Sequence, residues 1–206
     1  MHDLAAVTVP RKKVSPILRA RWKPPEGGVV KINVDAGYSE QQRHGSTGMV
    51  VRDHAGTLIR GQAIWYTYAQ CARTMEATAI RDGTRLAAEL GHRKVILESD
   101  AAEVVKLWNS ASFDRADVAA LCHEITELSM VFESFALVHV GRDANTAAHK
   151  CAKQASEERR RCIWVNYTPS FLQNCMQTDC NPSEPLSCKK KKLRVCSSSM
   201  KPMVYP

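Results

Sequence analysis

The chain has 206 residues, enough for one ordinary domain with tails, and 44% of them are hydrophobic, as expected for a globular core. Its net charge of +8 comes from the two ends, because residues 29–156 hold 14 Lys or Arg against 15 Asp or Glu; the basic composition therefore gives little evidence for a basic groove on the core. No stretch is long and apolar enough to cross a bilayer, and the N-terminus lacks the apolar run of a secretory signal, so we expect an intracellular protein of the nucleus or cytoplasm.

Residues 1–28 form a basic segment that ends in Pro and Gly residues, and we expect a linker there. Alternating apolar and polar residues after it predict strands. Three strands are expected, over Val29–Asp35, Gly48–Asp53 and Leu58–Tyr66. A polar loop over 37–45 separates the first two, and a tight Gly turn joins the last two into a hairpin.

The spacing of apolar residues then becomes helical. The expected elements are a helix over Ala72–Leu90, a strand over Val95–Leu97, helices over Asp100–Trp108 and Ala116–Met130, a strand over Phe135–Val140 and a helix over Asp143–Ser156. The order βββαβααβα predicts an α/β domain over residues 29–165, with a five-stranded mixed sheet flanked by helices. Residues 166–206 contain prolines, polar residues and the cluster KKKKLR, and we expect a disordered tail.

Three carboxylates are expected to meet at one edge of this sheet. Asp35 and Asp100 both follow apolar strands, while Glu76 lies in line with the apolar stripe of its helix. Like charges that close repel unless cations neutralise them, and oxygen ligands favour Mg²⁺ or Mn²⁺. The pattern therefore predicts a site for divalent cations.

Each carboxylate also has a purely structural interpretation. Asp35 suits the turn after a strand, and Asp100 suits a capping box with Glu103. Glu76 suits the positive N-terminal end of a helix. The residues alone leave these alternatives open.

Five segments stand in a recognisable order: WKPPEGGVVKINVDAG, GMVVRDHAG, MEATAIRDG, VILESDA and HVGRDANTAAHKCAK. In this combination the chain resembles the plant RNase H-like domains, a retroelement-derived, reverse-transcriptase-like family related to type 1 ribonuclease H. The resemblance extends from Trp22 to Trp164. It implies an RNase H-like fold and a metal-dependent hydrolase of nucleic acids.

The resemblance also implies the residues of the site. Asp35, Glu76 and Asp100 match the family ligands of two ions, Mg²⁺ or Mn²⁺. The fourth ligand of the family is an Asp, whereas this chain has His149 at that place. We therefore expect catalytic and metal-binding roles for Asp35, Glu76, Asp100 and His149. The alternative for His149 is a residue of the helix surface with no ligand role.

The activity implied is endonuclease cleavage of the RNA strand of an RNA–DNA hybrid, with the hybrid or RNA as partner and the protein as a monomer. Arg73, Thr74 and Asn145 are the expected nucleic-acid contacts, since the enzyme must distinguish RNA by its 2′-hydroxyl. A domain that kept the fold and lost turnover would be a nucleic-acid-binding module, and a protein-interaction scaffold is a third interpretation. The KKKKLR cluster is either a nuclear address, a nucleic-acid arm or a solvated tail.

Overall fold

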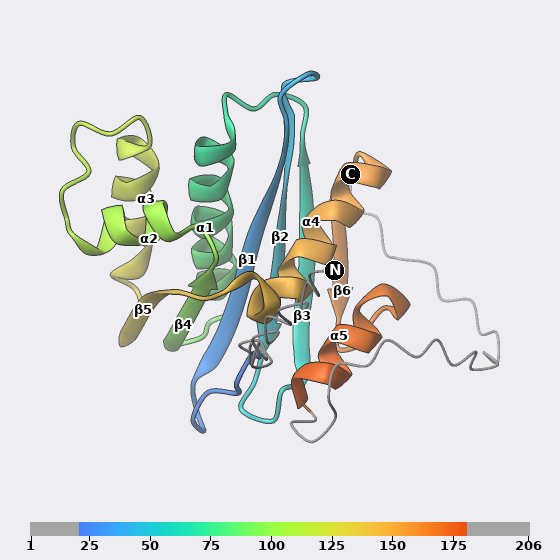
Figure 1. Cartoon of the computed structure of the whole chain (residues 1–206). Helices are drawn as coiled ribbons and strands as arrows, with labels where there is room; N and C mark the ends of the chain where they lie inside the picture. The colour runs from blue at the N-terminus through green and yellow to red at the C-terminus, as the bar shows by residue number, and fades with distance from the viewer. Residues whose placement is uncertain (1–20, 181–206) are drawn as a thin grey trace, which may run out of the picture.

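The computed structural model describes residues 21–180, which form one sheet of six strands with helices on both faces (Figure 1). The strands are β1 (Val30–Ser39), β2 (His44–Arg52), β3 (Leu58–Tyr66), β4 (Lys94–Ser99), β5 (Ser134–His139) and β6 (Cys162–Val165). The helices are α1 (Ala72–Glu89), α2 (Ala102–Asn109), α3 (Ala119–Ser129), α4 (Thr146–Glu158) and α5 (Ser170–Cys180), and a short 3₁₀ helix, η1 (Arg142–Asn145), precedes α4. The predicted α/β architecture with a mixed sheet is confirmed.

The strands lie in the order β5-β4-β1-β2-β3-β6, so β1 lies inside the sheet. β1 is parallel to β4 and antiparallel to β2. Its pairing with β4 ends at Val34 and Ser99, whereas its pairing with β2 continues to Ser39 and His44. The two parallel strands therefore part directly before Asp35.

Side chains of β1 alternate between two packed faces, as the period of a strand requires. Ile32 and Val34 belong to a core shared with α1, α2 and α3. Asn33 points to the opposite face, where it contacts Asn145 at the start of α4. A second apolar cluster on this face joins β2, β3 and β6 to α4 and α5. Figure 1 shows the resulting three layers, with α1 to α3 on one side of the sheet and α4 and α5 on the other.

Two glycines allow α1 and α4 to approach the sheet closely. A Cβ added to Gly83 of α1 would lie 2.4 Å from Val34 Cγ1. A Cβ added to Gly48 of β2 would lie 2.2 Å from the backbone nitrogen of Ala152 and 2.4 Å from the carbonyl oxygen of Ala148, both in α4. Each helix thus packs where no larger residue fits.

The predicted polar loop over residues 37–45 is too long, because only residues 40–43 form a turn between β1 and β2. Gly37 and Ser39 continue β1 and pair with Ser46 and His44 of β2. The segment is polar because it extends past the end of the β1–β4 pairing, so one edge of β1 is uncovered there. Its composition resembled that of a loop for this reason.

The predicted sheet lacked one strand, and the predicted tail began too early. β6 adds a sixth strand by pairing antiparallel with β3. α5 follows it and buries Leu172 and Met176 in the second apolar cluster, so the expectation of disorder is wrong for Ser170–Cys180. The KKKKLR cluster, the rest of the expected tail and residues 1–20 of the expected linker lie outside the described residues.

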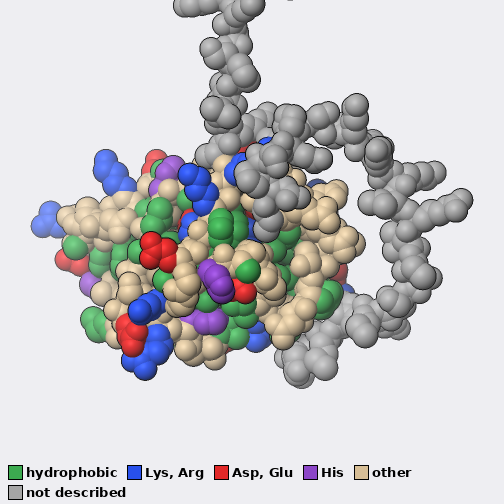
Figure 2. Space-filling model, turned by 90° about the horizontal axis from the view of Figure 1, so that it is seen from below, with side chains coloured by type: hydrophobic (Ala, Val, Ile, Leu, Met, Phe, Trp, Pro, Cys, Tyr) green, Lys and Arg blue, Asp and Glu red, His purple; other side chains and the backbone are tan. Residues whose placement is uncertain are grey.

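The surface of the core mixes its charges. On the face in Figure 2, Lys and Arg side chains are scattered among acidic, His and hydrophobic ones. This agrees with the nearly balanced charge of the central sequence. Between residues 21 and 180, none of the helices combines the length and apolar character that crossing a membrane requires.

Replacing Gly48 with Ala should destabilise the protein, because the added methyl group would meet backbone atoms of α4. We expect the free energy of unfolding to fall by about 1–3 kcal/mol, the usual cost of overfilling a packed interior, measured by urea denaturation. The matched control is Gly141→Ala, where an added Cβ meets no described atom within 4 Å. Its stability should stay within about 0.5 kcal/mol of wild type. Equal losses in the two variants would contradict the close approach of α4.

Candidate metal centre

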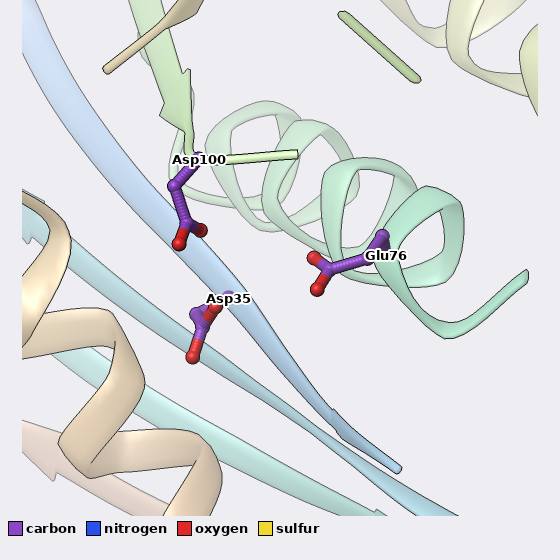
Figure 3. Close-up of side chains that lie close together, drawn as sticks. All are labelled: Asp35, Glu76 and Asp100. Carbon is purple, nitrogen blue, oxygen red and sulfur yellow. The ribbon is translucent and has the colours of Figure 1, made fainter. Parts of the chain in front are cut away.

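Three carboxyl groups point toward one another from separate parts of the chain (Figure 3). Asp35 lies on β1, Asp100 follows the end of β4, and Glu76 lies on α1. One carboxylate oxygen of each lies within 4.8 Å of those of the other two. Asp35 and Asp100 come directly after the last pair of β1 with β4. The parting of these strands leaves room for Glu76 to reach Asp35 from the α1 side.

The structural alternatives for these residues do not describe their positions. Asp35 lies within β1 and not in a turn. Asp100 does not cap α2, because the N-cap residue is Ala101 and makes no side-chain cap hydrogen bond in the described chain. Glu76 comes after the first turn of α1, whose N-terminal cap is the thiol of Cys71. The three carboxylates are therefore not accounted for by local backbone roles.

Burial and the proximity of the other carboxylates make Asp35 and Glu76 harder to ionise. Burial, followed by repulsion from Asp35 and Asp100, raises the pKa of Glu76 to about 8. Burial and the charge of Asp100 raise the pKa of Asp35 to about 6, although the hydrogen bond from His149 acts in the opposite direction. Such shifts are typical of carboxylates gathered at functional sites.

The donor set fits divalent cations. Glu76 Oε2 is buried and has no hydrogen-bond partner within residues 21–180. An unpaired buried carboxylate oxygen is costly unless a cation or donor reaches it. Three carboxylates form an oxygen-only set of the kind that Mg²⁺ and Mn²⁺ prefer. Asp35, Glu76 and Asp100 are thus the residues that would hold such ions.

A cavity of about 410 Å³ opens above the carboxylates. It is lined by Asp35, Ala36, Glu76, Asp100, Arg142, Asp143, Asn145, Thr146 and His149. Its walls come from both faces of the sheet, so a ligand in it would contact β1, α1 and the start of α4 together.

His149 touches the cluster without adding negative charge. Its Nδ1 lies 2.9 Å from Asp35 Oδ2, and its side chain is 69% exposed. The ring therefore engages one Asp35 oxygen and keeps most of its surface open to the cavity. His149 is therefore not a helix-surface residue without a partner, because it contacts one of the three carboxylates. Its binding of a cation stays a prediction.

The structure changes the expectation for Asn145. Its side chain is 1% exposed, and its Nδ2 donates to the Val34 carbonyl and to Asp100 Oδ1, each at 2.9 Å. Asn145 is thus an internal support of Asp100, which argues against the predicted contact with nucleic acid.

The other two predicted nucleic-acid contacts lie at the start of α1. Arg73 pairs with Asp117 at 3.4 Å and with Glu103 at 4.0 Å, and its side chain stays partly exposed. Thr74 contacts the thiol of Cys71 and lies in the first turn of the helix. Their contact with nucleic acid stays a prediction.

One residue near the carboxylates was missed at the sequence level. Arg142 places its Nε 3.6 Å from Asp100 Oδ2, with its side chain 95% exposed. Its position in the short turn Gly141–Arg142 was visible in the sequence, but nothing in the pattern placed that turn beside Asp100. An exposed cation at this edge can contact an anionic ligand.

Comparison with known proteins agrees with this architecture. A family model described as reverse transcriptase-like matches residues 33–155. No curated protein sequence matches the chain.

Three solved structures share the fold. RNase H1 from the halophilic archaeon Halobacterium salinarum NRC-1 has a TM-score of 0.59 and 20% identity, covering 63% of this chain and 98% of that one. The N-terminal RNase H domain of Rv2228c from Mycobacterium tuberculosis, solved as a fusion with maltose-binding protein, has a TM-score of 0.58 and 21% identity, covering 63% and 94%. LC11-RNase H1, solved in complex with an RNA/DNA hybrid, has a TM-score of 0.57 and 15% identity, covering 63% and 98%. At these identities the likeness shows the fold.

The pKa of Glu76 is raised from its ordinary value of 4.5 to about 8. The metal-free protein should therefore lose stability as the pH rises through this range. The folded chain holds the Glu76 proton more tightly than the unfolded chain, so this stabilisation is complete below pH 4.5 and lost through pH 8. At pH 8 without metal, Glu76→Gln should be more stable than wild type by about 1–2 kcal/mol, allowing for the partial exposure of the group. Thermal unfolding at several pH values measures this difference.

Added Mg²⁺ or Mn²⁺ should stabilise wild type more than Glu76→Gln, because binding favours the folded state. Glu89→Gln is the matched control, since Glu89 is an exposed residue of the same helix. If the stability of wild type and of Glu76→Gln changed with pH in the same way, the raised pKa of Glu76 would be refuted.

Proposed function

The chain belongs to the reverse transcriptase-like family and has an RNase H-like fold, and on this basis we propose that it is a metal-dependent endonuclease that cleaves the RNA strand of RNA–DNA hybrids. The observation that carries the proposal is the convergence of Asp35, Glu76 and Asp100 within 4.8 Å in a cavity at the edge of the sheet. The fold supports a ribonuclease H-type enzyme in general.

In the proposed site Asp35, Glu76 and Asp100 would hold two Mg²⁺ or Mn²⁺ ions. Such ions, when bound, activate an attacking water and stabilise the leaving oxygen of a phosphodiester. Asp35 is the most buried of the three and would hold an ion together with Glu76 and Asp100. Glu76 contributes an oxygen with no other partner in the described chain, so binding relieves its desolvation.

His149 and Arg142 act at the mouth of the cavity. His149 holds Asp35 Oδ2 by a hydrogen bond and thereby fixes the orientation of that carboxylate. Arg142 extends into solvent beside Asp100, where its guanidinium can contact a phosphate of the bound strand. Both residues would orient the backbone of the substrate over the carboxylates.

An RNA–DNA hybrid is the proposed substrate. The structural neighbour LC11-RNase H1 was solved with such a hybrid, which makes this substrate class the first to test. RNA is distinguished from DNA by contacts to the 2′-hydroxyl and by the shape of the minor groove. Arg73 and Thr74, at the N-terminal end of α1, are the proposed contacts.

A nucleic-acid-binding module without turnover is the second candidate, and the position of His149 favours it. The family pattern has a fourth carboxylate where this chain places an imidazole on Asp35. Imidazole is a poorer ligand for Mg²⁺ than a carboxylate, so one of the two ions would bind weakly. Hybrid binding that weakens with salt, without cleavage in Mg²⁺ or Mn²⁺, would identify this candidate. A protein without salt-sensitive binding would instead be an interaction scaffold.

Purified protein should cleave the RNA strand of a labelled hybrid in Mn²⁺ or Mg²⁺, and Asp35→Asn should lower the rate by roughly 100-fold or more, because a direct ligand matters at least as much as its supports. Gel analysis of the labelled strand measures the rate. The control is Asp114→Asn, which changes an exposed Asp that does not line the cavity of the carboxylates. Equal cleavage by wild type and Asp35→Asn would assign the activity to a contaminant and remove the proposal.

His149→Asp should strengthen the dependence on Mg²⁺, because it restores a fourth negative ligand. We expect the Mg²⁺ concentration at half-maximal cleavage to fall by about tenfold, as affinity follows the number of charged ligands. His149→Asn serves as the control, since it removes the imidazole without adding charge and should give no gain. A Mg²⁺ titration that is the same for Asp, Asn and His at this position would show that residue 149 is not a ligand.

A further inference from the structure

Four polar side chains form a continuous series of hydrogen bonds from the interior to the carboxylates. Arg52 Nη2 donates to Asn33 Oδ1 at 2.6 Å, and Asn33 Nδ2 donates to Asn145 Oδ1 at 3.2 Å. Asn145 Nδ2 then donates to Asp100 Oδ1 at 2.9 Å. Arg52 and Asn33 are fully buried and Asn145 is 1% exposed, so these groups depend on one another for hydrogen bonds.

The two ends of the series fix its direction. An Arg side chain only donates hydrogen bonds, and an ionised carboxylate only accepts them. Each Asn amide between them offers one acceptor and one donor group, so it must turn its oxygen toward Arg52 and its nitrogen toward Asp100. If the Asn145 amide turned over, its oxygen would face Asp100 and its nitrogen would face Asn33 Nδ2. The guanidinium therefore favours the amide orientation in which Asn145 donates to the carboxylate, and the Val34 carbonyl, which accepts from the same nitrogen, favours it too.

Asn145 also fixes where Asp100 lies. Its Nδ2 bonds the carbonyl of Val34, the last residue of β1 that pairs with β4. Asp100 is thus tied to the residue immediately before Asp35. One oxygen, Oδ1, is used by Asn145, and the other, Oδ2, is approached by the exposed Arg142. Oδ2 therefore stays on the cavity side of the carboxylate.

We propose that Asn145 is a positioning residue for Asp100, and that Arg52 sets its orientation through Asn33. The consequence for cleavage rests on the proposed nuclease function, whereas the consequence for cation affinity does not. Groups that orient a metal ligand without touching the metal commonly govern its affinity.

The far end of the series is anchored by segments outside residues 33–155, the part that matches the family. Asp179 of α5 pairs with Arg52 Nη1 at 2.7 Å, and the Trp22 ring centroid lies 3.6 Å from the guanidinium carbon. A buried Arg needs such partners because an unpaired buried charge is strongly unfavourable. α5 and the segment that carries Trp22 thus belong to the support of Asp100 as well as to the core.

The amide nitrogen of Asn33 donates to Glu98 as well as to Asn145. This nitrogen, Nδ2, lies 3.0 Å from Glu98 Oε2, and Glu98 pairs with Lys31 at 2.7 Å. The amide has two hydrogens, so both Glu98 and Asn145 can be satisfied. This second bond holds Asn33 in the same orientation that Arg52 requires.

The test is the Mn²⁺ affinity of full-length Asn145→Ala, measured by calorimetry below its melting temperature. We expect the affinity to fall by about 10- to 100-fold, as for other supports of metal ligands. The matched control is Asn109→Ala, which removes an Asn side chain that donates to the Leu137 carbonyl away from the carboxylates. Its Mn²⁺ affinity should equal that of wild type. A lower melting temperature for Asn145→Ala with an affinity within about twofold of wild type would overturn the proposal and leave a purely structural role.

A second variant tests the relay from Arg52. Asn33→Ala keeps Asn145 but removes the link, and Mn²⁺ affinity should fall in the same direction by a smaller factor. An unchanged affinity in Asn33→Ala, with a loss in Asn145→Ala, would refute the role of Arg52. Arg52→Lys keeps a positive charge that can only donate hydrogen bonds, so it should retain more Mn²⁺ affinity than Arg52→Met.

The outcomes separate this inference from the nuclease proposal. Wild type that binds Mn²⁺ but cleaves no hybrid would refute the nuclease and leave the affinity test valid. Cleavage by wild type with an undisturbed affinity in Asn145→Ala would refute the positioning role alone. Wild type without Mn²⁺ binding would refute both. Where cleavage occurs, added Mn²⁺ should restore kcat of Asn145→Ala, with little change in KM for the hybrid.

Discussion

The close approach of two helices to the central strands is the constraint on which the candidate site depends. Gly83 lets α1 lie against Val34, and Gly48 lets α4 lie against the backbone of β2. Glu76 and His149 are carried by these two helices, and they reach Asp35 from opposite faces of the sheet. A larger side chain at either glycine would move a helix outward, so the packing of the core and the geometry of the carboxylates are set by the same contacts.

This arrangement lowers the stability of the metal-free protein, and the same arrangement favours the binding of cations. The sheet brings Asp35 and Asp100 together where β1 and β4 part, and α1 adds Glu76. Burial and mutual repulsion raise the pKa of Asp35 and of Glu76, which means that ionising them costs folding free energy. In the proposed site the same uncompensated charge would attract divalent ions, so the repulsion that destabilises the metal-free protein would also give it affinity for cations.

The sequence was informative wherever a local pattern determined the structure. Alternation before Asp35 and a fully apolar run before Asp100 placed these two residues beside each other, where the pairing of β1 with β4 ends. Helical spacing placed Glu76 on the sheet side of α1. Two features were missed, one because the segment is too short to show a pattern and one because its cause is not local. β6 has only four residues, too few for a clear period. Arg52 resembled the polar end of a strand, yet its partner Asp179 lies 127 positions away, and no spacing rule connects such distant residues.

His149, which stands where the family pattern has an Asp, affects both the stability of the metal-free protein and the proposed affinity for cations. Its hydrogen bond to Asp35 lowers the pKa of that carboxyl, against the effect of burial, and so eases the assembly of the metal-free site. An Asp at the same position would instead add a fourth negative charge and increase the repulsion. The imidazole therefore lessens the repulsion in the metal-free protein, and for the same reason it would offer less to a second cation in the proposed site. Asn145 differs, because it orients Asp100 by a neutral hydrogen bond and leaves the charge of the cluster unchanged. The proposed cation affinity would thus depend on two separable properties, the orientation that the buried amides give to Asp100 and the charge at position 149.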